Sequence, residues 1–250
     1  MAREQFAFVS IEVALHELRG GRMIVVVDDE DRENEGDVMM AAEMVTPEAI
    51  NFMATHARGL ICVAMTGARL DELRLGPMTV DSTALGGTGF TVSIDVKGRG
   101  VTTGISARDR AQTIRAAIDG RSNPADFARP GHVFPLRCHA GGVLERRGHT
   151  ETAVDLALLA GLHPSGVICE ILRDDGNMAR VPDLVRFCKQ HALKMVTVAE
   201  VVRYRLECDY ELTRHHRGLV SPDQPGDFSP CSYSVSGATG QSVETLSDQG

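Results

Sequence analysis

The chain alternates short apolar runs with segments in which apolar residues recur at helical spacing. Apolar runs bounded by turn residues predict β-strands at 23–28, 38–43, 60–65, 90–96, 132–137, 166–172 and 194–198. Helical spacing, with Ser10 and Thr46 placed as caps, predicts helices at 10–20, 46–59, 106–118, 150–160, 182–191 and 198–205. Several predicted strands are apolar on both faces, so helices must cover both sides of the sheet.

This alternation predicts one continuous domain of helices packed on a mixed sheet over residues 1–206. From about Leu206 onward the chain loses its apolar periodicity and becomes rich in Ser, Gly, Pro, Asp and Gln. This composition predicts that residues 207–250 form a flexible C-terminal tail of unassigned role.

Charge and hydropathy narrow the classes of function. The formal net charge is −8, and no block of Lys and Arg interrupts the acidity, so nucleic acid is not an expected partner. No segment approaches the roughly 18 continuous apolar residues of a membrane span, and the N-terminus lacks the apolar core of a signal peptide. We therefore expect a cytoplasmic protein that does not interact with a membrane.

The segment DDEDRENEGD, residues 28–37, concentrates carboxylates between two predicted strands. Crowded carboxylates repel one another, so they must either face water or bind a cation, and oxygen ligands suit magnesium or manganese. A solvated acidic turn is the alternative. Because the flanking strands would hold both ends of this loop, we favour the cation site.

A second polar cluster, ERRGHTE, precedes the predicted helix at 150–160. The N-terminus of a helix offers free N–H groups, which together with Arg146 and the Thr150 hydroxyl would form a phosphate site. Thr150 as a simple helix cap is compatible with that role. His149 needs an acidic partner before it can be interpreted as a metal ligand, and the acidic loop supplies candidates.

Three further polar or reactive residues lie in predicted strands. His132 begins the run HVFPLR, and Glu170 interrupts the apolar run GVICEIL. A carboxylate there is costly to bury unless it is paired, protonated or catalytic, whereas an edge strand would let it face water. Cys62 in LICVAM is typical of a small core residue. The turns GGTGF and TTGIS are weak signals and lack the spacing of a nucleotide-binding loop.

The segments DDEDRENEGD, GLICVAMT, GFTVSID with TTGISARDR, RPGHVFPL, GGVLERRGHTETAVDL and GVICEILRDDGNMAR occur in one order between about residues 5 and 206. In this order they resemble the 3,4-dihydroxy-2-butanone 4-phosphate synthase family. The resemblance implies an α+β fold with three layers, in which helices flank a twisted mixed β-sheet. It also implies the conversion of ribulose 5-phosphate to L-3,4-dihydroxy-2-butanone 4-phosphate and formate, a lyase reaction that supplies a precursor of riboflavin.

The resemblance further implies roles for individual residues. Glu33 and His149 would hold a magnesium ion, for which manganese is a candidate substitute. The catalytic residues would be His132, Glu170 and Cys62, the last of which matches a thiol that lines the pocket. The substrate would be bound by the residues Arg32, Glu33, Asp37, Thr103, Arg146, His149, Thr150 and Glu170. A homodimer, with active sites completed across the subunit interface, is also implied.

Two rival functions remain from the sequence. One is a different metal-dependent sugar-phosphate isomerase or aldolase, which would release no formate. The other is a non-catalytic relative of the same fold that binds nucleotides or double-stranded RNA, against which the net acidity argues. In some relatives this domain is fused to GTP cyclohydrolase II, but the segment after Leu206 is short and has only Cys208 and Cys231 for a zinc site. We therefore expect no cyclohydrolase activity.

Overall fold

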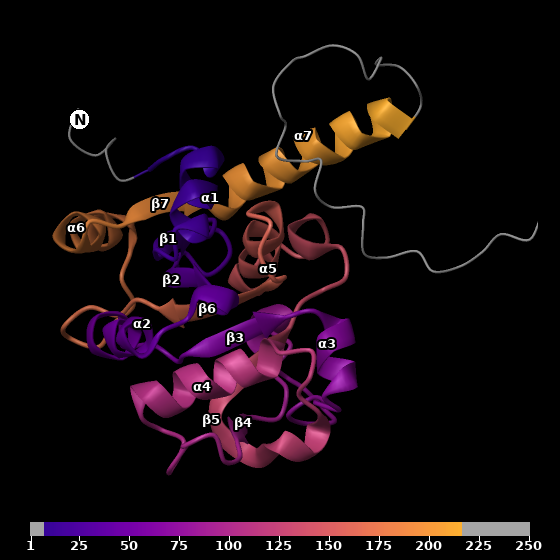
Figure 1. Ribbon diagram of the computed structural model, residues 1–250. Helices are drawn as coiled ribbons and strands as arrows, with labels where there is room; N and C mark the ends of the chain where they lie inside the picture. Colours follow the sequence, from indigo (N-terminus) through magenta and orange to yellow (C-terminus); the bar gives the residue numbers. More distant parts are fainter. Residues whose placement is uncertain (1–7, 217–250) are drawn as a thin grey trace, which may run out of the picture.

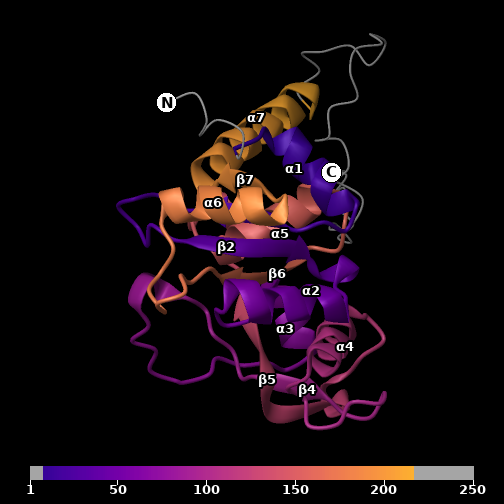
Figure 2. The same cartoon turned by 90° about the vertical axis from the view of Figure 1, so that its left-hand side faces the viewer.

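The computed structural model describes residues 8–216. Its seven strands form one mixed sheet in the order β4-β5-β3-β6-β2-β1-β7. In Figure 2 the labelled strands β7, β2, β6, β5 and β4 follow this order from top to bottom. The strands are β1 (Ile24–Val27), β2 (Gly36–Ala41), β3 (Cys62–Met65), β4 (Ile94–Val96), β5 (Phe127–Arg137), β6 (Ser165–Glu170) and β7 (Lys194–Thr197). Each of the seven predicted strands is present.

Helices cover both faces of the sheet. This was expected, because several strands are apolar on both faces. The described helices are α1 (Ile11–Arg19), α2 (Pro47–Phe52), α3 (Gly67–Glu72), α4 (Ala107–Ile118), α5 (His149–Leu159), α6 (Val181–His191) and α7 (Val198–His216). Figure 1 shows α2 and α6 on one side of the strands and α5 on the other. The predicted three-layer α+β fold is confirmed.

Alternate residues along each strand divide the apolar interior into two cores. Val25, Val38 and Val63 pack with residues of α2, α4 and α6, whereas Ile24 and Met39 pack with residues of α1, α5 and α7. Because successive strand side chains point to opposite faces, one apolar run supplies both cores. The central strands β1, β2 and β3 are buried along their whole length.

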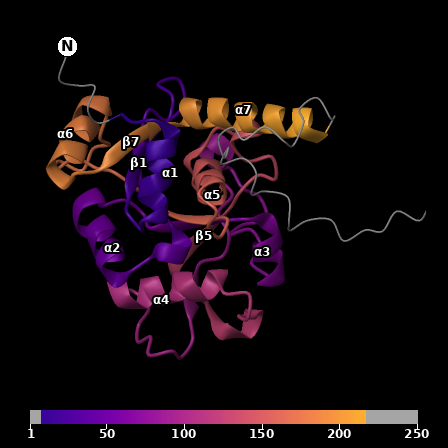
Figure 3. The ribbon, with the colours of Figure 1, turned by 45° about the horizontal axis from the view of Figure 1, so that its top comes forward.

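Three elements differ from the sequence prediction. Helix α3 (Gly67–Glu72) was not predicted, although Thr66 caps it by accepting a hydrogen bond from the Arg69 N–H. The predicted helix at 46–59 is α2 followed by a π-helical turn, Met53–Ala57. Helix α7 continues to His216, past the predicted end at Arg205, and it reaches beyond the sheet in Figure 3.

The boundary predicted between a domain at 1–206 and a tail at 207–250 therefore falls inside α7. Residues 217–250 of that tail lie outside the described residues. Within the described part of the chain, no helix combines the length and the apolar character needed to cross a membrane.

The strand register brings several predicted site residues to one end of the sheet. Val27 at the end of β1 pairs with Gly36 at the start of β2, and Asp37 pairs with Glu170 at the end of β6. Cys62 at the start of β3 pairs with Ile168 of β6. We call this the acidic end of the sheet, where β1 and β6 end and β2 and β3 begin. Residues more than 100 positions apart in sequence meet there.

Candidate active site

The acidic loop between β1 and β2 is a folded turn rather than a solvated run of charges. Both oxygens of the buried Asp28 accept backbone hydrogen bonds, Oδ2 from the Glu33 N–H at 3.1 Å and Oδ1 from the Glu35 N–H at 2.8 Å. Nη1 of Arg32 lies 2.8 Å from both Asp28 Oδ2 and Glu33 Oε2. These contacts hold the Glu33 carboxylate in a defined place, which is the first requirement for a ligand site.

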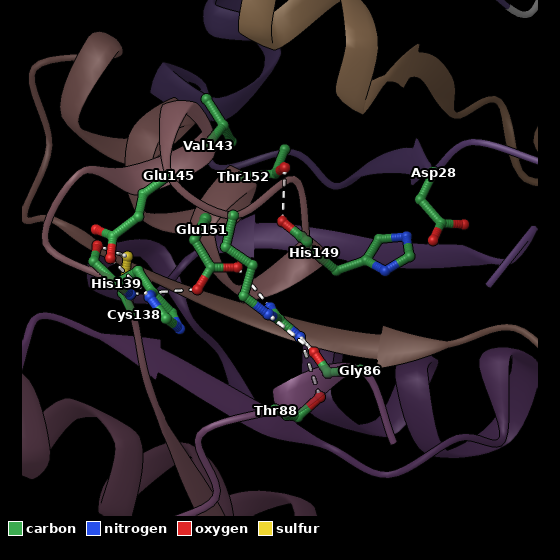
Figure 4. Close-up of polar contacts among 12 residues, drawn as sticks. Asp28, Gly86, Thr88, Cys138, His139, Val143, Glu145, His149, Glu151 and Thr152 are labelled. Carbon is green, nitrogen blue, oxygen red and sulfur yellow. Dashed lines mark hydrogen bonds and ion pairs between the residues drawn. The ribbon is translucent and has the colours of Figure 1, made fainter. Parts of the chain in front are cut away.

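His149 begins α5 and lies beside the acidic loop. Its Nδ1 is 3.6 Å from Oε2 of Glu33, so the two groups form an ion pair that is too long for a hydrogen bond. The ring is buried, and among the described residues its Nε2 has no hydrogen-bond partner. In Figure 4 the ring points toward Asp28. The structure thus brings together Glu33 and His149, which are separated by more than 100 residues in sequence.

Asp28, Glu33 and His149 can together hold a divalent metal ion, because their ligand atoms all lie within 4.8 Å of one another. Two neighbouring ligands about 2.1 Å from one octahedral ion lie about 3 Å apart, so the 3.6 Å separation of Glu33 and His149 needs only a small closure. Nε2 of the His149 ring has no hydrogen-bond partner among the described residues, so this nitrogen too is available to coordinate an ion. Asp28 was not singled out from the sequence, because nothing in a run of carboxylates marks which of them turns inward.

The charges at this centre shift one another's pKa values. The neighbouring His149 ring lowers the pKa of Glu33 to about 2, with Arg32 assisting and partial burial opposing. Burial alone would lower the pKa of His149, but the carboxylates of Asp37, Glu33 and Asp28 raise it to about 9. Without a metal ion the imidazole is therefore a cation at neutral pH that compensates the surrounding negative charge.

Asp37 and Glu170 lie side by side on β2 and β6. Asp37 is buried, and burial together with the nearby Glu170 raises its pKa to about 7, while His149 opposes the rise. Such a carboxyl group can donate or accept a proton near neutral pH. Oε2 of Glu170 accepts a hydrogen bond from the Leu60 N–H at 2.8 Å. Because β6 lies between β3 and β2, the edge-strand alternative for Glu170 is wrong.

Cys62 lies at the start of β3, in the same end of the sheet. Its side chain is buried, and burial followed by the charges of Glu170 and Asp37 raises the pKa of its thiol well above the ordinary value. A thiol in this setting is neutral and a poor nucleophile. The preceding Gly59 lets β3 approach β6, because a Cβ there would lie 2.4 Å from the Glu170 carbonyl oxygen.

The residues predicted to bind phosphate lie around Arg146. Its Nη1 lies 2.6 Å from Oε2 of Glu151, and its Nε and Nη2 donate to the Gly86 carbonyl oxygen. Its Nη2 also donates to Oγ1 of Thr88 at 3.3 Å. Figure 4 labels these three partners, Glu151, Gly86 and Thr88. Thr150 is buried at the second position of α5, while Gly148 is the N-cap, so Thr150 is not the cap.

The turn GGTGF therefore matters more than the sequence indicated. A Cβ on Gly86 would lie 3.3 Å from Oε1 of Glu33, so this turn touches the acidic loop as well as Arg146. Glu151 was also missed, although its place two residues after His149 was a usable signal. A third missed residue is Arg180, whose Nη1 donates to the carbonyl oxygen of Glu33 at 2.8 Å.

His132 and Thr103 belong to a second group. Asp95 of β4 accepts from the His132 N–H at 2.9 Å and contacts His132 Nδ1 at 2.6 Å. The Thr103 loop packs on Asp95, since a Cβ on Gly104 would lie 2.1 Å from Asp95 Oδ2, and Gly104 has a φ of +93°. Among the described residues, no hydrogen bond links this second group to the acidic loop.

Three comparisons bear on this arrangement. The family model for 3,4-dihydroxy-2-butanone 4-phosphate synthase matches residues 12–204. The riboflavin biosynthesis protein RibBA of Aquifex aeolicus is 60% identical over 205 residues, which are 82% of this chain and 50% of that protein. The 3,4-dihydroxy-2-butanone 4-phosphate synthase of Neisseria meningitidis is 54% identical over 191 residues, 76% of this chain and 52% of that protein.

Solved structures are similar over most of the chain. A 3,4-dihydroxy-2-butanone 4-phosphate synthase in complex with two magnesium ions has a TM-score of 0.75 and 38% identity, covering 85% of this chain and 100% of its own. The two-domain synthase RibBX of A. baumannii has a TM-score of 0.76 and 48% identity over 79% of this chain and 58% of its own. The chain spans about half the length of the curated relatives it matches. With its fold and the matched residues 12–204, the chain belongs to the 3,4-dihydroxy-2-butanone 4-phosphate synthase family.

Proposed function

We propose that this chain is a magnesium-dependent lyase that converts D-ribulose 5-phosphate to L-3,4-dihydroxy-2-butanone 4-phosphate and formate, a precursor step of riboflavin biosynthesis. The observation that carries the proposal is the group of Asp28, Glu33 and His149, which can hold one divalent ion at the end of a buried sheet. Family membership supports the reaction, and the similar structure with two magnesium ions supports the choice of metal.

The metal would be held by Glu33 and His149, with Asp28 as a third candidate ligand. A bound magnesium ion would act as a Lewis acid that stabilises negative charge on the substrate oxygens. Manganese, which accepts the same oxygen and imidazole ligands, is a candidate substitute. Arg32, whose Nη1 pairs with both Asp28 and Glu33, would orient these two carboxylates. Its other N–H groups would donate to substrate hydroxyl groups.

The phosphate would be bound where α5 begins. The free N–H groups of the first turn and the Thr150 hydroxyl can donate to phosphate oxygens. Arg146, oriented by the buried Glu151, would add a guanidinium to this cradle. Because His149 is the first residue of α5, the same helix start would fix the phosphate and the metal relative to each other.

Proton transfers would be divided among groups with different surroundings. Asp37, whose pKa is about 7, can take and return a proton without a large energetic cost. Glu170 is paired with it on the neighbouring strand β6 and would exchange a proton with an adjacent carbon or hydroxyl group of the substrate. The hydrogen bond between His132 Nδ1 and Asp95 favours the tautomer with a free Nε2, which can accept a proton. Cys62 would line the pocket rather than react, because its thiol stays protonated.

We further propose that the chain works as a homodimer in which each active site is completed by the partner subunit. The support is that His132 and Thr103 form a group without hydrogen bonds to the acidic loop among the described residues. An isologous contact would bring this group of one subunit to the acidic end of the other. The proposed synthase domain covers residues 1–206, which agrees with a family match that ends at residue 204.

The reaction is tested by incubating the purified chain with ribulose 5-phosphate and magnesium, and measuring formate. We expect one formate for each pentulose phosphate consumed, loss of formate on addition of EDTA, and recovery when excess magnesium is restored. Ribose 5-phosphate serves as the matched control substrate and should yield no formate. Consumption of ribulose 5-phosphate without formate would instead favour an isomerase or aldolase. Tight binding of double-stranded RNA without any turnover would favour the non-catalytic alternative.

A further inference from the structure

A second pocket lies at the end of the sheet opposite to the acidic end. Its volume is about 700 Å³, and it forms where β3 ends at Met65 and β5 ends at Arg137. The second half of α5 and Arg205 of α7 complete its walls. Its lining includes no residue of the acidic loop and neither His149 nor Thr150. The volume is within the range of about 300–1,000 Å³ found for small-molecule sites.

The walls of this opposite-end pocket are largely apolar. Ala68 lies on α3, Val154 and Leu158 lie on α5, and Pro164 precedes β6. Leu158 is one of the large hydrophobic side chains that remain exposed, at 39%. When the apolar part of a ligand displaces water from a concave apolar wall of this kind, the change in free energy favours binding.

The charged groups of the pocket favour an anion. The lining contains two guanidiniums, of Arg137 and Arg205, and one carboxylate, of Asp155, so its formal charge is positive when His139 is neutral. Asp155 is buried; its Oδ1 lies 2.8 Å from Nη1 of Arg205, and its Oδ2 accepts from the Val143 N–H at 3.0 Å. Arg205 is therefore held in place by a fixed partner. Its Nη2 also lies 3.8 Å from Oδ2 of Asp209, which is too long for a hydrogen bond, so this side of the guanidinium can still donate to a ligand.

Arg137 can redirect its charge toward a ligand at low cost. Its Nη2 pairs with Asp71 Oδ1 at 2.5 Å, but the Asp71 side chain is 71% exposed and that of Arg137 is 37% exposed. Ion pairs exposed to this degree contribute little to stability because water and salt screen them. The two guanidiniums thus differ in mobility: that of Arg205 is fixed by a buried ion pair, whereas that of Arg137 can reorient toward a ligand.

From this combination we propose that the opposite-end pocket binds a small organic anion with an apolar body. The anionic group would lie between Arg137 and Arg205, and the apolar body would pack on Val154 and Leu158. The proposed sugar-phosphate substrate lacks an apolar body, so this ligand belongs to a different chemical class. The site does not depend on the proposed reaction, because it shares none of the residues assigned to metal or substrate.

The binding test uses a matched pair of fluorescent probes on the whole chain. The anionic probe is 8-anilinonaphthalene-1-sulfonate, and the neutral probe is N-phenyl-1-naphthylamine, which has the same ring system without the sulfonate. We expect one saturable site for the sulfonate with a Kd of about 10–100 µM, the range typical of a ligand of this size. The neutral probe should bind about tenfold more weakly, because it makes no charge-assisted hydrogen bond.

Two variants and one control locate the site. Ala68→Trp fills the pocket from an exposed position on α3 and should abolish saturable binding of both probes. Arg137→Leu removes the adjustable charge and should weaken only the sulfonate, by about tenfold. Arg121→Leu is the control, since the Arg121 side chain is 91% exposed and lies outside the pocket lining. It should bind both probes as the unmodified chain does.

Thermal unfolding of each variant is measured alongside, so that a misfolded variant is recognised and replaced by Leu158→Asp, which places a negative charge in the wall. Absence of saturable sulfonate binding to the unmodified chain would overturn the proposal. Equal binding to the unmodified chain and to folded Ala68→Trp would overturn it as well. Equal affinity for the two probes would contradict the assignment of the ligand as an anion.

Discussion

At the scale of single residues, the candidate site is defined by a few charges held in fixed places. The His149 ring lowers the pKa of Glu33 to about 2. Despite its burial, the pKa of His149 is raised to about 9 by the carboxylates of Asp37, Glu33 and Asp28. Asp37 is displaced to about 7 mainly by its own burial. Glu33 therefore stays charged, and Asp37 can exchange protons near neutral pH. The positive charge of His149 can be replaced by that of a metal ion.

Glu33→Gln tests the metal site. The substitution keeps the volume and removes the negative charge, so formate production should be lost and magnesium affinity should fall by at least about tenfold. Formate assays and calorimetric titration with magnesium measure the two effects. Glu30→Gln, at an exposed position of the same loop, is the control and should leave both unchanged. A Glu33→Gln variant with a near-normal rate would refute the assignment.

Glu170→Gln tests the division between metal binding and proton transfer. Glu170 lies outside the group of Asp28, Glu33 and His149, and its amide replacement can still accept from the Leu60 N–H. Turnover should therefore be lost while magnesium affinity stays within about twofold, because the ligand charge is unchanged. The same two assays apply. If magnesium affinity fell together with turnover, Glu170 would belong to the metal site.

The pH dependence of metal binding follows from His149. A metal ligand must be the neutral imidazole, and a pKa raised to about 9 means that the ring is protonated at neutral pH. Below this pKa each metal ion that binds must displace one proton, so the affinity should rise about tenfold for each unit of pH between roughly 7.5 and 9, and then level off. Calorimetry in buffers of different ionisation enthalpy counts the released proton. A magnesium affinity independent of pH over this range would show that His149 is not a ligand.

At the scale of elements, the site depends on how loops and helix starts are tied to the sheet. The acidic loop is held by Asp28 from within and by Arg180 at the start of α6 from outside. The Thr103 loop is held by the buried Asp109 of α4, whose Oδ2 accepts from Thr102 and Gly104. Arg180 and Asp109 are assigned to neither metal nor substrate, but their hydrogen bonds set where Glu33 and Thr103 lie.

Arg180→Leu tests the outer anchor of the acidic loop. Removing the guanidinium removes its hydrogen bonds to the carbonyl oxygens of Glu33 and Asn34. The Glu33 carboxylate becomes less well placed, and magnesium affinity should fall by about tenfold, as is typical when a group that orients a ligand is lost. The control Arg186→Leu removes a guanidinium from the exposed surface of the same helix and should not change the affinity. Equal affinities in the two variants would exclude this role for Arg180.

At the scale of the whole molecule, two groups of site residues lie on one sheet without a direct hydrogen bond between them among the described residues. The acidic end carries the candidate metal ligands, and β4 and β5 carry Asp95 and His132. In the proposed homodimer, the second group of one subunit would lie at the acidic end of its partner. The opposite-end pocket lies at the other ends of the strands, so a ligand there would leave the acidic end free.

Mixing two inactive variants tests the shared site. Glu33→Gln and His132→Asn would each be inactive alone, but a mixed dimer contains one active site with neither substitution. Random reassociation after unfolding and refolding together should therefore restore about a quarter of the normal formate rate, since half of the dimers are mixed and each has one intact site. The unmodified chain taken through the same refolding is the control. No recovery beyond the separate variants would place both residues in the same subunit's site.

The sequence by itself determined the seven strands, most helices and the three-layer architecture, because runs that are apolar on both faces can be stable only between two layers of helices. It also pointed to the acidic loop, His149 and Arg146 as chemistry-bearing, and the family resemblance implied Glu33 within that loop. Only the tertiary structure decided that Asp28 turns inward, that Gly86 and Glu151 surround Arg146, and that Asp95 orients His132. The extension of α7 and the short helix α3 also had no clear periodic signal. The physical reason is that periodicity reports which face of an element is buried, whereas the partners of a charged side chain are set by strand register and loop closure between distant segments.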